Sequence, residues 1–313
     1  MTEIDAVVTW VDGDLPLHRR KRERYMTRAG TPLHENGINP HRWASNDELG
    51  YCLRSIANNA KWIRHVWIVT DAQSPELSGL PADFQKKIKL VDHQELFEGH
   101  NEVLPTFNSL AIESLLWRIP DLSERFIYFN DDVFLTAPLA PEDIFRGQAT
   151  VLRGKWVDYS DLKNDEAQRS DPALFNHYTQ INAAAMLGFH ADHLFATAHV
   201  VHPLRRSVMA QLFENHTAAF LRNITYRFRD VSQFVPQSLH NHACILNGQF
   251  VLETAEDHLH LRTGAVLDYP LEDVRAYLRK ALEPDSKFLC INDLPQLEGA
   301  IPDTREWIER AIA

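Results

Sequence analysis

The chain contains, at residues 126–135, the run Phe126-Ile127-Tyr128-Phe129-Asn130-Asp131-Asp132-Val133-Phe134-Leu135. Its aromatic and β-branched residues are typical of a buried strand. Polar residues at the end of such a strand fall where α/β sheets bind their ligands. We therefore expect Asp131 and Asp132 to lie at a strand tip.

Two adjacent carboxylates in a partly buried cleft repel each other unless a cation lies beside them. Oxygen ligands of this kind suit Mg²⁺ or Mn²⁺, which also bind substrate phosphates. Asn-Asp-Asp is equally ordinary turn chemistry between two apolar segments. These ten residues alone leave both interpretations open: a metal-diphosphate site, or a turn.

Other predicted strands also end in polar residues. The strand within residues 4–14 runs into Trp10, Asp12 and Gly13, where a glycine lets backbone approach a ligand and a tryptophan can stack on a base. A plain turn with a core tryptophan fits the same residues. The strand at residues 63–71 ends in Thr70 and Asp71, and the strand at 88–93 ends in Asp-His. Because helical stretches separate these strands, the pattern predicts a doubly wound, mostly parallel sheet with a ligand crevice along one edge.

Two predicted helices begin with polar residues. Ser45 or Asn46 can cap a helix that runs through residues 49–56, and Asn108 can cap a helix that extends to about residue 119. Polar groups at a helix N-terminus suit phosphate or ribose contacts, but they equally suit capping alone.

Histidine and arginine are concentrated in the second half of the chain. His199, His202, Arg205 and Arg206 fall within residues 198–206, and further arginines and histidines follow at residues 227–229 and 240–242. An anionic substrate such as a sugar phosphate would explain this density, and salt bridges to an acidic surface are the alternative. Near the end, residues 287–293 form another aromatic-led strand that finishes in Asn292 and Asp293. This second strand tip could face the same cation as the first.

Composition narrows the class of protein. The 313 residues are 44% hydrophobic and 24% charged, which is ordinary for a globular enzyme, and the formal net charge of −11 disfavours a nucleic-acid partner. Three cysteines without CxxC spacing indicate neither a disulfide framework nor a zinc site. The sequence shows no signal-peptide pattern and no apolar run of membrane-spanning length. We therefore expect a cytoplasmic enzyme.

Taken in order, these blocks resemble the four conserved regions of the Stealth family. The matching blocks are residues 5–14, residues 46–49 through 104–109 to 130–132, the His/Arg region, and residues 288–293. That family includes bacterial capsular polysaccharide phosphotransferases and the animal GlcNAc-1-phosphotransferase. The resemblance implies a GT-A-like, Rossmann-type nucleotide-sugar fold in a single catalytic domain over residues 1–313. Residues 1–150 would bind the nucleotide sugar and the metal, 151–286 would form a helical His/Arg excursion with the acceptor site, and 287–313 would return to the site.

The resemblance also implies an activity. The enzyme would transfer a hexose- or N-acetylhexosamine-1-phosphate from a UDP-sugar to a hydroxyl of a saccharide acceptor, with Mg²⁺ or Mn²⁺ as cofactor, and release UMP. This would serve capsular or exopolysaccharide synthesis, with peripheral association with an export complex. A metal-dependent GT-A glycosyltransferase that releases UDP is the alternative. A catalytically silent sugar-nucleotide-binding subunit is a third hypothesis, which the histidines and arginines disfavour.

Site residues follow from the same resemblance. His202 would be the general base and Arg229 would stabilise the phosphoryl oxygens, with Arg227 open to the same role, while the neighbouring His199 is expected to be structural. Asp131 would take part in catalysis, and the metal ligands would be Asp131, Asp132, Asn292 and Asp293. The nucleotide-sugar side would be lined by Trp10, Asp12, Gly13, Asn46, Asp47, Arg54, Thr70, Asp71 and Asn108.

Overall fold

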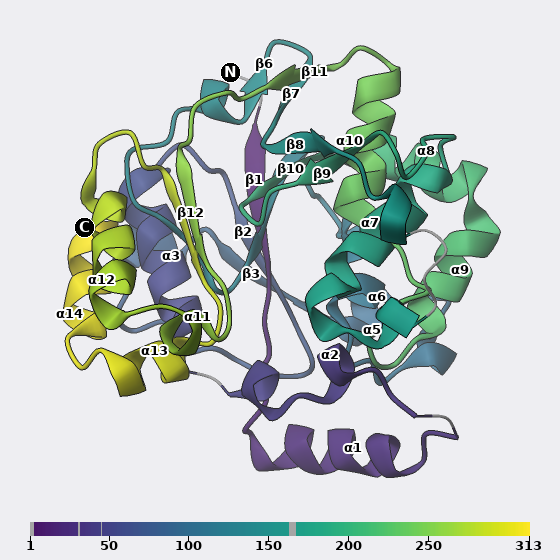
Figure 1. Ribbon diagram of the computed structural model, residues 1–313, viewed down its shortest axis with the longest axis horizontal. Helices are drawn as coiled ribbons and strands as arrows, with labels where there is room; N and C mark the ends of the chain where they lie inside the picture. Colours follow the sequence, from purple (N-terminus) through teal and green to yellow (C-terminus); the bar gives the residue numbers. More distant parts are fainter. Residues whose placement is uncertain (1–2, 31, 45, 163–166) are drawn as a thin grey trace.

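A computed structural model describes residues 3–30, 32–44, 46–162 and 167–313 (Figure 1). Its centre is a five-stranded sheet of order β10-β4-β1-β2-β3. The strands are β1 (Ile4–Thr9), β2 (Val66–Thr70), β3 (Ile88–Asp92), β4 (Arg125–Asn130) and β10 (His202–Arg205). The first four are parallel, and β10 pairs antiparallel with β4. The predicted fold class, a mostly parallel sheet flanked by helices, is confirmed.

Alternating side chains of the central strands form two hydrophobic cores. Val8, Ile68 and Phe129 pack on one face against α3 (Glu48–Asn59), together with α12 (Leu271–Arg279), α13 (Leu294–Ala300) and α14 (Thr304–Ile312). Val7 and Phe126 pack on the opposite face against α5 (His93–Leu96), α6 (Ser109–Glu113) and α9 (Thr217–Thr225). Figure 1 shows these two groups of helices on opposite sides of the sheet. A sheet covered on both faces explains why its strands read as continuous apolar runs.

The central run of residues 126–135 is two strands, not one. β4 ends at Asn130, Asp131 and Asp132 form a turn, and β5 (Val133–Leu135) begins a second sheet. There β5 pairs antiparallel with β13 (Phe288–Ile291), which pairs parallel with β12 (His258–Leu261). The turn and the strand-tip interpretations are therefore both correct, because the chain leaves one sheet and enters another at the two aspartates.

The bounds of the remaining helices and strands are as follows. The remaining helices are α1 (Pro16–Thr27), α2 (Glu35–Ile38), α4 (Ala82–Gln85), α5 (His93–Leu96), α6 (Ser109–Glu113), α7 (Phe175–Ala185), α8 (Arg206–Asn215), α9 (Thr217–Thr225), α10 (Pro236–Leu246), α11 (Ala265–Asp268), α12 (Leu271–Arg279), α13 (Leu294–Ala300) and α14 (Thr304–Ile312). The remaining strands are β6 (Phe145–Arg146), β7 (Ala149–Leu152), β8 (Gly154–Val157), β9 (Leu194–Thr197) and β11 (Phe250–Leu252). Short 3₁₀ helices lie at Pro40–Trp43, Asn101–Val103, Leu116–Arg118, Pro141–Asp143, Ser160–Leu162, Ala167–Ser170, Pro172–Leu174 and Lys280–Leu282.

Part of the His/Arg density is structural. The buried His240 accepts a hydrogen bond from the backbone N–H of Arg205 at 3.0 Å, and His242 accepts one from the backbone N–H of Phe195 at 3.1 Å. Both histidines lie on α10 and attach strands β10 and β9 to it. Arg206 donates to the carbonyl of Trp117 at 3.0 Å. These side chains hold the backbone in place, and the sequence alone could not distinguish this role from substrate binding.

Strand order places the expected crevice. The chain adds β2 and β3 on one side of β1 and then crosses to add β4 on the other side. The carboxyl ends of β1 and β4 therefore meet at a topological switch point, where open α/β sheets bind ligands.

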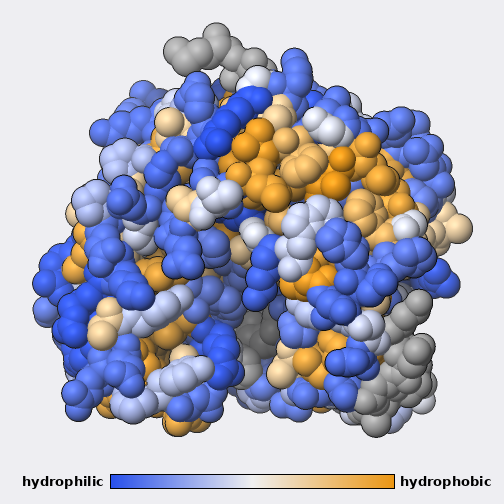
Figure 2. Space-filling view, turned by 45° about the horizontal axis from the view of Figure 1, so that its top comes forward, coloured by the Kyte–Doolittle hydropathy of each residue, from blue (hydrophilic) through white to orange (hydrophobic). Residues whose placement is uncertain are grey.

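The surface is mixed. Among the described residues, no helix has both the length and the apolar composition needed to cross a bilayer. The face shown in Figure 2 is largely hydrophilic, with hydrophobic side chains gathered in one area of its upper half.

Candidate functional site

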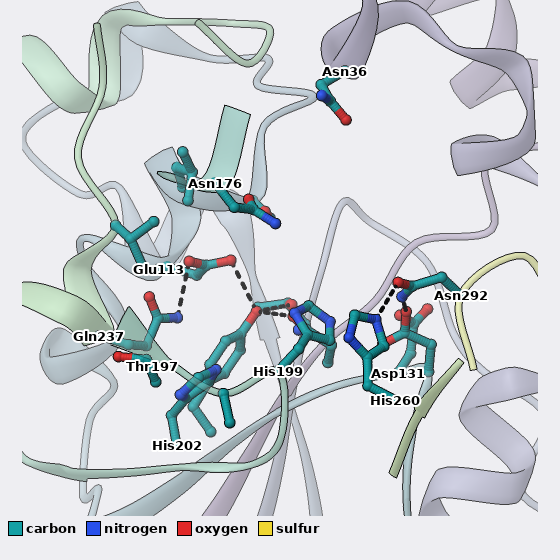
Figure 3. Close-up of a pocket in the computed structure, with 18 of the residues that line it drawn as sticks. Asn36, Glu113, Asp131, Asn176, Thr197, His199, His202, Gln237, His260 and Asn292 are labelled. Atoms are coloured by element: carbon teal, nitrogen blue, oxygen red, sulfur yellow. Dashed lines mark hydrogen bonds between the residues drawn. The ribbon is translucent and has the colours of Figure 1, made fainter. Parts of the chain in front are cut away.

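A cavity of about 850 Å³ opens at the switch point between β1 and β4. Its lining includes Trp10 after β1 and Asn130, Asp131 and Asp132 after β4. The second half of the chain also reaches it: the lining includes His199, His202, Arg229, His260, Asn292 and Asp293. Figure 3 shows His199, His202, Asp131 and Asn292 around this one space. The two strand tips that the sequence singled out do meet here.

The carboxylate pair is crowded. Asp131 is half-buried beside Asp132 and near Glu48, and desolvation first, then these two acidic neighbours, raise the pKa of its carboxyl well above the usual range. Asp132 accepts a hydrogen bond through Oδ2 from Nδ2 of Asn292 at 2.6 Å. Its other oxygen, Oδ1, is buried without a hydrogen-bond partner in the described part of the chain. An unpaired carboxylate oxygen beside a second carboxylate is the donor set that a hard divalent cation prefers.

Asn292 differs from the expectation in its orientation. Its amide nitrogen faces Asp132, while its Oδ1 lies 2.7 Å from Nε2 of His260. Asn292 therefore holds the carboxylate in place, and its oxygen points away from the aspartates. Asp293 follows with a positive φ of 59°, precedes α13 and lines the cavity.

The two candidate arginines take different positions. Arg229 lines the cavity, donates through Nη2 to Oγ of Ser109 at 2.7 Å, and has its pKa lowered by burial. Arg227 instead donates to the carbonyls of Glu102 and Leu104, both at 3.2 Å, and its guanidinium lies 5.0 Å from the ring centroid of Tyr25. Arg227 is not among the lining residues. Only Arg229 is placed to meet a ligand in the cavity.

His202 lies on the cavity wall with its ring stacked on Tyr128 at 6.1 Å between centroids. Burial, followed by the nearby His199 and His240, lowers the pKa of His202 to about 3. Its imidazole is thus neutral at working pH and able to accept a proton. His199 lines the same cavity, and its ring stacks on that of His260 with 4.7 Å between the centroids.

Comparison with known proteins identifies the family. The family model described as "Stealth protein CR1, conserved region 1" matches residues 2–30, and "Stealth protein CR2, conserved region 2" matches residues 42–152. The chain belongs to the Stealth family. The second match contains the aspartate pair, whereas the resemblances in the His/Arg region and at residues 288–293 stay predictions.

Relatives of this Stealth chain are named as exopolysaccharide or capsular polysaccharide phosphotransferases. It is 32% identical to an exopolysaccharide phosphotransferase of Streptomyces coelicolor, over 93% of this chain and 47% of the relative. It is 42% identical to the capsular polysaccharide phosphotransferase cps1A of Actinobacillus pleuropneumoniae, over 73% of this chain and 61% of the relative. The capsular polysaccharide phosphotransferase LcbA of Aeromonas hydrophila is 33% identical over 72% of this chain and 61% of its own length. The Stealth chain thus spans about half the length of the curated relatives it matches.

A solved structure was also matched. The galactosyltransferase LgtC, crystallised with donor and acceptor sugar analogs, aligns with a TM-score of 0.44 and 12% identity, over 92% of this chain and 86% of that one.

Several residues expected on the nucleotide side of the Stealth chain lie outside the cavity lining. Only Trp10 and Asn108 of that set belong to it; the residues outside are Asp12, Gly13, Asn46, Asp47, Arg54, Thr70 and Asp71. Their side chains have structural surroundings instead. Asp12 accepts a hydrogen bond from the backbone N–H of Asp14 at 3.0 Å, and Thr70 is buried at the end of β2. A Cβ at Gly13 would lie 2.3 Å from the carbonyl oxygen of Trp43, so close packing against Trp43 requires a glycine here.

Ion pairs and hydrogen bonds account for the rest of that set. Asn46 donates to Glu298 at 2.5 Å, and Asp71 pairs with Lys21 at 2.6 Å. Arg54 pairs with Asp47 at 3.5 Å and with Glu309 at 3.0 Å. The alternative cap residue Ser45 lies outside the described residues. The partners Glu298, Lys21 and Glu309 are distant in sequence, so the local pattern could not separate these pairs from ligand contacts.

Asn108 reaches the lining but its polar groups are used. Its Oδ1 accepts from the backbone N–H of Leu110 at 3.1 Å and caps α6. Its Nδ2 lies 2.8 Å from the carbonyl of Tyr226, 3.1 Å from that of Phe228 and 2.8 Å from Oε1 of Gln233. The capping interpretation is the correct one here, and the same side chain fixes the segment that carries Arg229.

Sequence reasoning missed several titratable lining residues, among them Glu48, Glu113 and His260. Glu48 lies near the aspartates and burial raises its pKa, Glu113 accepts a hydrogen bond from Gln237 at 2.9 Å, and His260 contacts Asn292. Glu48 directly follows the Asn46-Asp47 pair, so its acidic side chain in the first turn of a helix was the one available signal. Glu113 and His260 sit in unremarkable local sequence, and only the fold brings them to the cavity.

Proposed function

We propose that the chain transfers a sugar-1-phosphate, a hexose- or N-acetylhexosamine-1-phosphate, from a UDP-sugar to a hydroxyl of a saccharide acceptor and releases UMP. The observation that carries this proposal is the convergence of an aspartate pair, a half-buried arginine and the neutral His202 on one cavity. The names of the relatives support a phosphotransferase in capsular or exopolysaccharide synthesis. The proposed place of work is the cytoplasm, at the periphery of a polysaccharide export complex.

Asp131 and Asp132 would hold Mg²⁺ or Mn²⁺. Two features support this assignment: the buried Oδ1 of Asp132 has no hydrogen-bond partner among the described residues, and the pKa of Asp131 is raised. A cation would give that oxygen a partner and would offset the repulsion between the two carboxylates. When bound, the cation would neutralise charge on the diphosphate of the donor.

The protein groups would act mainly by position and charge. Phosphoryl transfer requires little covalent chemistry from an enzyme beyond these two contributions. Arg229, half-buried and oriented by Ser109, would donate hydrogen bonds to the phosphoryl oxygens where charge develops. The acceptor hydroxyl would attack the β-phosphorus, the bond from that phosphorus to the bridging oxygen would break, and UMP would leave with the bridging oxygen. His202 would take the hydroxyl proton, because its imidazole is neutral.

The product nucleotide tests the reaction. The protein is incubated with a panel of UDP-sugars, Mg²⁺ and saccharide acceptors, and the nucleotides are separated by chromatography. UMP should accumulate in proportion to modified acceptor, the new linkage should appear as a phosphodiester by ³¹P NMR, and EDTA should stop the reaction reversibly. Stoichiometric UDP with a phosphorus-free product would make the protein a glycosyltransferase and contradict the proposal.

A comparison of two histidine variants tests which side chain is the general base. His202→Ala should lower kcat by about 10²–10⁴-fold with little change in UDP-sugar affinity. His199→Ala is the matched variant, because both histidines line the cavity and are three residues apart. If His199→Ala is inactive while His202→Ala is near wild type, the base is His199 and our assignment is wrong.

A further inference from the structure

His260 takes no part in the transfer step proposed above, yet two short hydrogen bonds link it to the carboxylate pair. Nε2 of His260 lies 2.7 Å from Oδ1 of Asn292, and Nδ2 of Asn292 lies 2.6 Å from Oδ2 of Asp132. Figure 3 shows these two hydrogen bonds leading from His260 through Asn292 to the aspartates. Asp132 and Asn292 are 160 residues apart in sequence.

The direction of both bonds follows from the groups involved. An ionised carboxylate only accepts hydrogen bonds, so the NH₂ group of Asn292 must face Asp132. The carbonyl oxygen of Asn292 then faces His260 and can only accept, so Nε2 of His260 must carry a proton. The two hydrogen bonds therefore have one consistent arrangement, in which His260 donates to Asn292 and Asn292 donates to Asp132.

His260 is itself held firmly. It lies on β12 directly opposite Cys290 of β13, and its backbone N–H donates to the hydroxyl of Tyr277 at 3.0 Å. Its ring stacks on His199 with an angle of 22° between the planes. A donor fixed by strand pairing and by ring contact can orient the amide that it binds.

From this geometry we infer that His260 is a positioning residue for Asp132, acting through Asn292. By engaging Oδ2, the Asn292 amide fixes the carboxylate rotation, so that Oδ1, which is buried and has no partner among the described residues, is the oxygen presented to a cation. Groups that orient a metal ligand in this way commonly change metal affinity when they are removed. The inference rests on the proposed function in one respect, namely that the aspartates bind a divalent cation.

A direct metal-binding role for His260 is a weaker account of the same residues. Ligand atoms of His199, His260 and Cys290 lie within 4.8 Å of one another. However, the two rings face each other, whereas a metal lies in the plane of each imidazole that binds it. Nε2 of His260 is occupied by its hydrogen bond, and Cys290 is a buried thiol whose pKa is raised well above its ordinary value. The hydrogen-bond role uses the observed geometry without rearrangement.

Two substitutions separate these roles. His260→Phe keeps an aromatic ring against His199 but removes the donor, while His260→Gln keeps a donor near the position of Nε2 but removes the imidazole. Mn²⁺ binding is measured by water-proton relaxation, with Mn²⁺ alone and with Mn²⁺ plus UDP. His260→Phe should weaken Mn²⁺ binding by about 10–100-fold, and His260→Gln should stay within about threefold of wild type.

A double-mutant cycle tests whether the effect passes through Asn292. Asn292→Ala should weaken Mn²⁺ binding like His260→Phe, and adding His260→Phe to it should change little more, because the intermediate is already missing. His193→Phe, an exposed histidine outside the cavity lining, is the control for histidine replacement and should bind Mn²⁺ as wild type does. Circular dichroism of each variant checks that its fold is retained.

The outcomes are distinguishable. Equal loss in the Gln and Phe variants would mean that the imidazole itself binds metal, and fully additive effects in the cycle would mean that His260 acts independently of Asn292; either result overturns the inference. If wild type binds Mn²⁺ and releases UMP but His260→Phe binds Mn²⁺ normally, the inference fails and the proposed function stands. If wild type binds no Mn²⁺ under either condition, the proposed metal site fails and the inference with it.

Discussion

Asp131, a residue of the proposed metal site, lowers the stability of the metal-free fold. Its side chain is half-buried next to Asp132 and near Glu48, so ionisation of Asp131 creates repulsion that the protein alone does not relieve. A folded-state pKa above the unfolded value means that this group destabilises the fold as pH rises above about 3.8. Active sites commonly carry strain of this kind.

Asp131→Asn should therefore raise the melting temperature of the metal-free protein, because a neutral amide of the same shape removes the repulsion. The increase should be a few degrees at neutral pH, measured by calorimetry in EDTA, and turnover should be lost. Added Mg²⁺ should raise the melting temperature of wild type but not of the variant. A variant that melts lower than wild type in EDTA would contradict this account of the site.

The arginines make a second comparison at this scale. Arg229→Lys keeps the charge but loses the planar fork, so kcat should fall by about 10²-fold. Arg227→Lys, two residues away and outside the cavity lining, should leave kcat within about threefold of wild type. Steady-state rates with a UDP-sugar donor measure both variants, and an inactive Arg227 variant beside a normal Arg229 variant would reverse our assignment.

At the scale of elements, short helices and turns position the site. The strand run at residues 126–135 changes sheet at Asp131 and Asp132, which places both carboxylates where two sheets meet. Helix α6 is only five residues long, yet its capping residue Asn108 also holds residues 226–233, the segment that carries Arg229. One side chain thus joins the start of a helix to the loop that carries Arg229.

Asn108→Ala should cost on the order of 3 kcal/mol in the free energy of unfolding, since it removes a cap and leaves buried carbonyls unpaired. It should also lower kcat, because Arg229 loses its support. Asp92→Ala is the matched control: Asp92 caps the short helix α5 at an exposed site and should cost about 1 kcal/mol without affecting kcat. Urea denaturation of the two variants gives both values, and equal costs would show that the bonds to residues 226–233 contribute nothing.

At the scale of the whole molecule, histidines kept neutral by desolvation link folding to pH. The pKa values of His93 and His240 are lowered to about 4 and that of His202 to about 3, in each case chiefly by burial. The unfolded chain binds protons on these groups below about pH 6.5, while the folded chain does not bind them until its lower pKa values are reached. Their contribution to stability is therefore complete above pH 6.5 and is lost as pH falls toward 4.

The free energy of unfolding should accordingly fall on acidification, by up to about 1.4 kcal/mol per pH unit for each such histidine. Asp131 contributes with the opposite sign, so a difference between proteins is more informative than one curve. His93→Phe keeps a ring beside Phe97 and should flatten the wild-type slope between pH 6.5 and 4 by about the contribution of one histidine. Denaturant unfolding at half-unit pH steps in EDTA measures this difference, and parallel curves would refute the linkage.

The sequence by itself determined the features that lie within one short segment. The apolar runs predicted β1 to β4 and β13, and the polar residues after β1 and β4 correctly marked the edge of the sheet that holds the cavity. Adjacent aspartates at the end of a buried strand need no distant partner to be recognised. Each of these inferences follows from periodicity or from neighbouring residues, which local physics fixes.

Only the tertiary structure decided which polar residues face the cavity. Asn46, Arg54 and Asp71 resembled ligand-binding groups in sequence, but residues far along the chain pair with them instead. His240 and His242 proved to hold backbone, whereas His260 reached the aspartates through Asn292. A side chain's role depends on the partner that the fold supplies, and that partner can lie more than a hundred residues away, where no local pattern records it.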